Sequence, residues 1–161
     1  MKKVLLLVLL TGSILLAQPT INGIGNDASY ITVGTWTQGN TGFGDHGIKQ
    51  LKAYNDGNYL YVMIIGEAES NFNEIYLYIN SSGAGDGVTA GTQLPAGNDG
   101  SSPFSSFRPT MDFQIDYAFR LSSGPSNAYV SIIRYLENGN TDTYLGGPAN
   151  DGSVLTVSSG T

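Results

Sequence analysis

Residues 53–66 read AYNDGNYLYVMIIG, and this stretch decides the fold class. Two apolar, aromatic-rich runs flank Asn55-Asp56-Gly57-Asn58. Asp-Gly is a strong signal for a tight hairpin turn, because these two residues tolerate positive φ best. The run after the turn, residues 59–65, has the aromatic and β-branched composition of a strand. The sequence therefore predicts an antiparallel hairpin whose core face carries Leu60, Val62 and Ile64.

Further runs with strand composition follow this pattern along the chain. They cover residues 20–22, 30–38, 48–54, 74–80, 110–121, 127–136, 141–145 and 154–157. The run 110–121 alternates strictly, with Met111, Phe113, Ile115, Tyr117, Phe119 and Leu121 on one face. Residues 81–109 are too long for an ordinary connection, which predicts a functional or mobile loop. No crossover helix is evident, so we expect an all-β protein, an antiparallel β-sandwich of jelly-roll type with about eight or nine strands.

The N-terminus has the layout of a secretory signal peptide. Met1-Lys2-Lys3 is a short positive region, residues 4–16 are mostly apolar, and Ala17 is a small residue at which cleavage can occur. The alternative, a membrane anchor, needs about 20 apolar residues, so we expect no membrane span after cleavage. The sequence predicts a leader over 1–17 and one domain over 18–161, in which 158–161 begin a linker or form a frayed end. The expected location is secreted, either extracellular or at the cell surface.

The composition excludes several classes of function. The chain has no cysteine, which rules out disulfides, thiolate metal sites and cysteine nucleophiles. Thirteen acidic residues face seven basic ones, for a net charge of −6. Nucleic-acid binding needs a basic patch, and the basic residues after the leader are scattered. They are Lys49, Lys52, Arg108, Arg120 and Arg134. We therefore expect no nucleic-acid partner.

The order of these features resembles a group of exported β-sandwich domains. Residues 21–30 (INGIGNDASY) precede the strand with the tryptophan, and KAYNDGNYLYVMIIGEA, EIYLYINSSGAGDG and DFQIDYAFRL follow. Over residues 21–145 this order is similar to family 9 carbohydrate-binding modules and DOMON-like domains of secreted bacterial proteins. The matching positions are Asp56, Leu60, Tyr61, Val62, residues 76–80, Asp116 and Tyr117. The sequence departs from this group at two points. Relatives carry a pair of acidic residues for calcium, of which only Asp86 is present here. They also hold sugars between two tryptophans, of which only Trp36 is present here.

Tyrosines form the most suggestive group of candidate binding residues. Tyr59 and Tyr61 share one face of their strand, and Tyr76 and Tyr78 share one face of theirs. If the two strands were neighbours, the four rings would form a cross-strand cluster. Together with Trp36, such a platform could stack on sugar rings. The competing interpretations are rings that cover a sheet face, rings packed under the long loop, and rings buried in a subunit contact.

Metal and catalytic residues are weakly represented. Calcium prefers several oxygen ligands, and Asp86 and Asp99 are the candidates in Gly-rich loops, although turn chemistry alone explains every Asp-Gly pair. We therefore predict no cofactor, with calcium as the alternative. His46 is the only histidine and stands beside Asp45 without a nucleophile motif. Asp112 and Asp116 on one strand would lie about 13 Å apart, too far to act as a pair. We expect no enzyme, unless the chain is a fragment of a larger secreted hydrolase.

Together these observations predict a secreted, non-catalytic binding module. The expected partner is a polysaccharide or a cell-surface glycan, and the expected ligand-binding residues are Trp36, Tyr59, Tyr61, Tyr76 and Tyr78. The alternative is a structural or adhesive subunit of an extracellular matrix, surface layer or filament. In that case residues 18–25 would add as a strand to the open sheet edge of a neighbouring copy.

Overall fold

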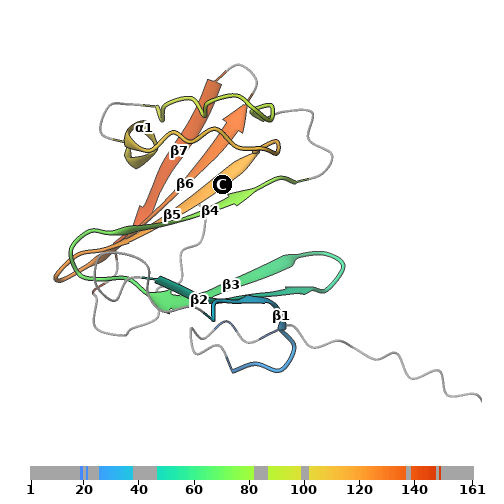
Figure 1. Cartoon of the computed structure of the whole chain (residues 1–161). Helices are drawn as coiled ribbons and strands as arrows, with labels where there is room; N and C mark the ends of the chain where they lie inside the picture. The colour runs from blue at the N-terminus through green and yellow to red at the C-terminus, as the bar shows by residue number, and fades with distance from the viewer. Residues whose placement is uncertain are drawn as a thin grey trace, which may run out of the picture.

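The residues that the structure describes form two antiparallel β-sheets and one short helix (Figure 1). The computed structural model describes residues 19, 21, 26–37, 47–81, 87–98, 102–136, 139–147 and 149. The three-stranded sheet has the order β1-β2-β3, with bounds Ile31–Thr35, Gly47–Asn55 and Leu60–Glu67. The four-stranded sheet has the order β4-β5-β6-β7, with bounds Glu74–Ile79, Tyr117–Ser123, Ala128–Leu136 and Gly139–Gly146. The helix α1 spans Pro103–Ser106.

This architecture confirms the prediction of an all-β, antiparallel protein. The described residues form seven strands, against the eight or nine expected. Of the two expected strands that are missing, 154–157 lies outside the described residues, and in 20–22 only Ile21 is described. The expected leader, His46, Asp45, Asp86 and Asp99 also lie outside them. No helix in the described ranges has the length and apolar character needed to cross a bilayer.

The β2–β3 hairpin forms where the sequence predicts it, but its turn differs from the expected one. Asn55 pairs with Leu60, so residues 56–59 make a four-residue loop. Within this loop only Gly57 has positive φ, +92°, whereas the prediction required positive φ at Asp56 as well. The reason is that Asp56 Oδ1 accepts hydrogen bonds from the backbone N–H groups of Asn58 and Tyr59, at 2.8 and 2.7 Å. The Asp56 N–H also donates to the Tyr59 carbonyl at 3.3 Å, so the carboxylate and one backbone hydrogen bond together close the turn.

The predicted strand 110–121 is correct only in its second half, because β5 begins at Tyr117. Ahead of it, Thr110 and Ile115 make isolated bridges with Gln93 and Val88 in the long connection. At Asp116 the chain passes from bridges with the long connection to pairing with β4 and β6. Asp116 is 2% exposed, and its Oδ2 accepts hydrogen bonds from the backbone N–H and the hydroxyl of Ser81, at 2.6 and 2.8 Å. The alternating pattern of the sequence therefore begins before the strand does.

The main buried core lies on one face of the four-stranded sheet, beneath the long connection, and not between the two sheets (Figure 1). Val88, Leu94 and Phe104 from the connection pack against Ala118, Ile133 and Tyr135 from the sheet. The helix α1 presents Phe104 to this core and begins with Pro103, which suits a first helical position. The Ser102 hydroxyl caps the helix by accepting from the Phe104 N–H at 3.2 Å. The loop predicted to be functional or mobile thus supplies three of the seven described residues of this core.

A short turn between β3 and β4 carries the chain from one sheet to the other. Phe72 in this turn has φ +68°, the one positive value at a non-glycine residue in the described ranges. The backbone N–H of Phe72 donates to the Ser123 carbonyl at 2.8 Å, and the Ser122 hydroxyl donates to the Phe72 carbonyl at 3.2 Å. The Phe72 ring lies against Gly124 and contacts Tyr129, with ring centroids 6.1 Å apart. Two backbone bonds and a packed ring hold this strained residue in place.

Candidate functional site

Tyrosines gather at the tip of the β2–β3 hairpin. Tyr54 stands directly opposite Tyr61, and their ring centroids lie 5.9 Å apart with an interplanar angle of 41°. Tyr59 contacts Tyr61 edge-on at 6.4 Å. Tyr30 precedes Ile31, whose partner is Ala53, so Tyr30 lies beside this end of β2. Tyr30, Tyr54, Tyr59 and Tyr61 are called the tyrosine row below.

Asp56 fixes the exposed end of the tyrosine row. Besides closing the turn, its Oδ2 accepts a hydrogen bond from the Tyr61 hydroxyl at 3.1 Å. Partial desolvation and this hydrogen bond raise the pKa of Tyr61 above its ordinary value. The Tyr59 ring remains 64% exposed. The hairpin tip therefore presents one accessible ring beside a ring with a fixed hydroxyl and a carboxylate oriented by backbone hydrogen bonds.

The tyrosine row belongs to the outer face of the three-stranded sheet. Side chains alternate along β3, so Tyr61, Met63 and Ile65 point away from the face that carries Leu60, Val62 and Ile64. Opposite Met63 and Ile65 stand Lys52 and Gln50. The Gln50 amide donates to the Thr35 hydroxyl at 3.3 Å. The aromatic end of this face thus continues into a mixed polar and apolar surface.

The other predicted binding residues lie elsewhere. The expected four-tyrosine cluster does not form, because β3 and β4 belong to different sheets and are not neighbours. Tyr76 and Tyr78 stack on each other at 5.9 Å with an interplanar angle of 9°, half-buried under the long connection. Tyr76 also contacts Phe104 and Phe107. Two of the predicted binding residues are therefore packing residues of the core margin, which is the interpretation that competed with a binding role.

Trp36 is 52% exposed but does not join the tyrosine row. Its backbone N–H donates to the Lys49 carbonyl at 2.9 Å, at the end of β2 opposite the hairpin tip. Six residues of strand separate Lys49 from Asn55, which corresponds to about 20 Å. Trp36 and Tyr59 therefore cannot clamp a single sugar ring.

Sequence reasoning missed Tyr30 and Tyr54. Tyr54 could have been found from the hairpin signal. In a hairpin that turns at residues 56–59, Asn55 faces Leu60 and Tyr54 faces Tyr61. The position of Tyr30 could not be found in this way, because it depends on how β1 pairs with β2, and that pairing contains a register shift between Thr32 and Gly34.

The described residues contain no group of three or more His, Cys, Asp or Glu side chains that could hold a metal ion. Asp112 is exposed, whereas Asp116 is buried and bonded to Ser81. These two carboxylates occupy different environments, and Asp116 has a structural role in anchoring the chain at residue 81.

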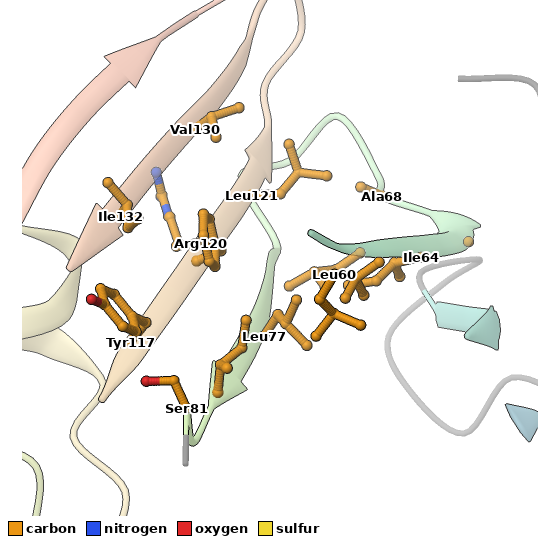
Figure 2. A pocket seen from close by; sticks show the side chains of 15 residues that line it. Leu60, Ile64, Ala68, Leu77, Ser81, Tyr117, Arg120, Leu121, Val130 and Ile132 are labelled. Carbon is orange, nitrogen blue, oxygen red and sulfur yellow. The ribbon is translucent and has the colours of Figure 1, made fainter. Parts of the chain in front are cut away.

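An apolar cleft separates the two sheets, with a volume of about 730 Å³ (Figure 2). Side chains from β3 and from β4 to β6 point into it from its two walls. Leu60, which the sequence assigns to a core face, is 59% exposed, and Phe119 and Leu121 are 36% and 38% exposed. The lining is almost wholly aliphatic and aromatic, from Leu60, Val62, Ile64, Ile75, Leu77, Ile79, Phe119, Leu121, Val130 and Ile132.

Three polar side chains are among the residues that line this cleft: Ser81, Tyr117 and Arg120. Ser81 is engaged with Asp116, and the guanidinium of Arg120 is engaged with Glu74 through its Nε at 2.9 Å and through its Nη2. By strand alternation, Arg120 and Glu74 point to the face of the sheet opposite the cleft. The cleft is therefore suited to apolar contacts and poorly suited to a sugar, which needs many hydrogen-bond partners.

No family model matches this chain, and no curated protein or solved structure shows a match to it. The resemblance to family 9 carbohydrate-binding modules and DOMON-like domains therefore stays a prediction. The tyrosine row and the cleft are identified by geometry alone.

Proposed function

We propose that the protein is a secreted, non-catalytic module that binds carbohydrate through the tyrosine row. The observation that carries this proposal is the contact of Tyr54, Tyr59 and Tyr61 at the hairpin tip, with the Tyr59 ring 64% exposed. An exposed aromatic ring offers an apolar face to a sugar, and the neighbouring polar groups offer hydrogen bonds. Here these groups are the Asp56 carboxylate and the Tyr61 hydroxyl.

The charge of the chain is compatible with this ligand. A net charge of −6 opposes binding to phosphate-rich polymers, whereas a neutral polysaccharide carries no charge to repel. The finer fold prediction, a β-sandwich of jelly-roll type, belongs to the same proposal. The two antiparallel sheets support the two-sheet part of this prediction, while all paired strands among the described residues are consecutive in the chain.

The test is binding of residues 18–161 to soluble β-glucan, xylan and galactomannan by affinity electrophoresis, and to insoluble cellulose by pull-down. Tyr59→Ala and Tyr61→Ala should each weaken binding about tenfold, or about 1.4 kcal/mol, because each removes a contacting ring. Tyr144→Ala is the matched control, since Tyr144 is 60% exposed but lies on β7 of the other sheet. Failure of the wild-type chain to bind any of the four polymers, or an equal loss for Tyr144→Ala, would contradict the proposal.

A second candidate function, assembly into a surface layer, matrix or filament, is favoured by the β1 edge. All five residues of β1 are exposed, including Ile31 at 71% and Val33 at 62%. The strand contains no charge and no proline, the usual protections of an edge strand. In the described part of the chain, β1 pairs with β2 alone. Such an edge can accept a strand from a neighbouring copy, for which residues 18–25 are the proposed donor.

This second function predicts an increase in molecular mass with protein concentration, measured by light scattering. Deleting residues 18–25 removes the donor, and Val33→Lys places a charge on the acceptor edge, so either change should return the protein to a monomer. Phe113→Lys is the control, because Phe113 is a 40% exposed apolar residue outside the strands. A wild-type chain that stays monomeric at high concentration would exclude this function.

A further inference from the structure

The β3–β4 turn bounds one end of the cleft between the two sheets. Residues 68–73 join the end of β3 to the start of β4, so the two walls of the cleft meet there (Figure 1). Away from the turn, β3 leads back to Leu60 and β4 leads on to Ile79, and both residues line the cleft. From Ile75 to Ile79 this wall measures about 13 Å. The cleft is therefore elongated, and Leu60, which is 59% exposed, marks its accessible end.

The size and lining of the cleft suit one hydrocarbon chain. Its volume of about 730 Å³ falls within the range of about 300–1,000 Å³ that small-molecule sites occupy. The side chains along its length are aliphatic or aromatic, and Val62, Phe119 and Leu121 stay partly exposed although they line it. A hydrocarbon chain laid along the cleft would remove this surface from water, which is favourable in proportion to the area covered. A sugar would instead lose hydrogen bonds to water and find few replacements.

Polar groups gather at the end of the cleft away from the turn. Figure 2 shows Ser81 and Tyr117 at that end, whereas Ala68 lies at the other. Tyr117 pairs with Arg134 on β6, and directly paired residues point to the same side of a sheet, so Arg134 belongs to the cleft face beside Tyr117. Arg134 is exposed and is one of the few basic residues of the chain. A guanidinium and a phenol hydroxyl both donate hydrogen bonds of the kind that a carboxylate accepts.

We propose that the cleft binds one free long-chain fatty acid, with its methyl end near Ala68 and its carboxylate at Arg134 and Tyr117. The hydrocarbon chain would cover the apolar walls, and the single charge would meet the one guanidinium assigned to this end of the cleft face. A second copy of the chain fits less well, because two concave surfaces do not fill each other. The tyrosine row lies on the outer face of the three-stranded sheet, so this site does not rest on the proposed carbohydrate binding.

Isothermal titration calorimetry of residues 18–161 with laurate, myristate and palmitate, each below its micellar concentration, tests the apolar part of the site. Binding should be saturable, with one acid per chain. Each added methylene that the cleft buries should tighten binding about fourfold, equivalent to ~0.8 kcal/mol. Val62→Trp fills the cleft and should weaken palmitate binding at least about tenfold. Met63→Trp is the matched control, because this neighbouring residue of β3 points to the outer face and its variant should bind as the wild type does.

A second comparison tests the head group. Arg134→Gln removes the charge and should weaken laurate binding about tenfold. It should leave the binding of dodecan-1-ol unchanged, since this alcohol has the same chain and no charge. Lys52→Gln is the matched control: it also removes a positive charge, but Lys52 stands opposite Met63 on the outer face of the other sheet, so both ligands should bind as to the wild type.

A third measurement uses the unmodified chain and therefore needs no variant to fold. Stearate with a nitroxide near its methyl end should broaden the backbone amide signals of Gly66 and Ala68 more than that of Ser81, and a nitroxide near the carboxylate should do the reverse. Absence of saturable binding, equal affinity for the three acids, equal effects of the two tryptophan variants, or an equal loss of laurate and dodecan-1-ol in Arg134→Gln would overturn the proposal. No readout involves a polysaccharide, so its failure is distinguishable from failure of the carbohydrate proposal.

Discussion

At the scale of single residues, the hydrogen bonds of the hydroxyl groups distinguish the tyrosines that pack in the core from those at the surface. The Tyr61 hydroxyl has a carboxylate partner at the surface. The Tyr76 hydroxyl donates to Glu74 at 2.6 Å, inside a network that includes Arg120. Among the described residues, the buried hydroxyls of Tyr78 and Tyr135 have no hydrogen-bond partner. These two side chains therefore serve the core through their rings, and their hydroxyls add nothing to it.

Alkaline pH should destabilise the protein through these buried tyrosines. Burial and the Glu74 carboxylate raise the pKa of Tyr78 to about 12, and burial raises the pKa of Tyr135 as well. Below pH 10 these groups are neutral in both states and have no effect. Between pH 10 and 12 the unfolded chain loses protons that the folded chain keeps, so the free energy of unfolding falls, by up to about 1.4 kcal/mol per pH unit for each group.

Urea unfolding followed by circular dichroism at pH 9, 10 and 11 measures this slope. Tyr78→Phe should flatten it, and at pH 9 the variant should be as stable as the wild type or more so, because its hydroxyl has no partner to lose. A variant with the same slope as the wild type would show that Tyr78 does not cause the alkaline destabilisation.

At the scale of elements, the β3–β4 turn determines which strands become neighbours. Phe72 adopts positive φ there, and such a conformation costs about 1–2 kcal/mol for a residue with a side chain. The ring packs against Gly124 and Tyr129, and the backbone bonds to Ser122 and Ser123. This turn sends β4 into the second sheet, and as a result it also separates Tyr59 and Tyr61 from Tyr76 and Tyr78.

Gly124→Ala tests the importance of this turn. A Cβ atom at Gly124 would lie 2.5 Å from the Phe72 ring, so the ring must move, and we expect a loss of about 1–3 kcal/mol of stability. Gly34→Ala is the matched control, because a Cβ atom there has no neighbour within 4 Å and its change should stay within about 0.5 kcal/mol. Thermal or urea denaturation gives both values, and equal stabilities for the two variants would contradict this account of the turn.

At the scale of the whole molecule, the sequence predicted the strands better than their packing. Alternation and the Asp-Gly turn identified the β2–β3 hairpin and four of the other five described strands within a few residues, whereas β5 begins seven residues after its predicted start. Packing was harder because β4 is apolar or aromatic on both faces, with Ile75, Leu77 and Ile79 on one and Tyr76 and Tyr78 on the other. Which face is buried depends on Val88, Leu94 and Phe104, which follow no strand or helix period.

The candidate site was predictable to the same degree. Tyr59 and Tyr61 follow from the hairpin, and Tyr54 could have been added from its register. The separation of Tyr76 and Tyr78 from that group could not be foreseen, because β3 and β4 join different sheets and no composition signal in the turn between them marks this. Local rules therefore located the strands and half of the tyrosine row, and long-range contacts decided the rest.

The location of the core has a consequence for the order in which the chain folds. Every described member of the buried cluster comes from residues 88–135, and none comes from the described residues 26–37 and 47–67. As synthesis proceeds from the N-terminus, the three-stranded sheet emerges before any part of that cluster exists. A two- or three-stranded sheet without a core is marginal by itself. We therefore expect the nascent chain to form no stable globular structure until β6 has been made.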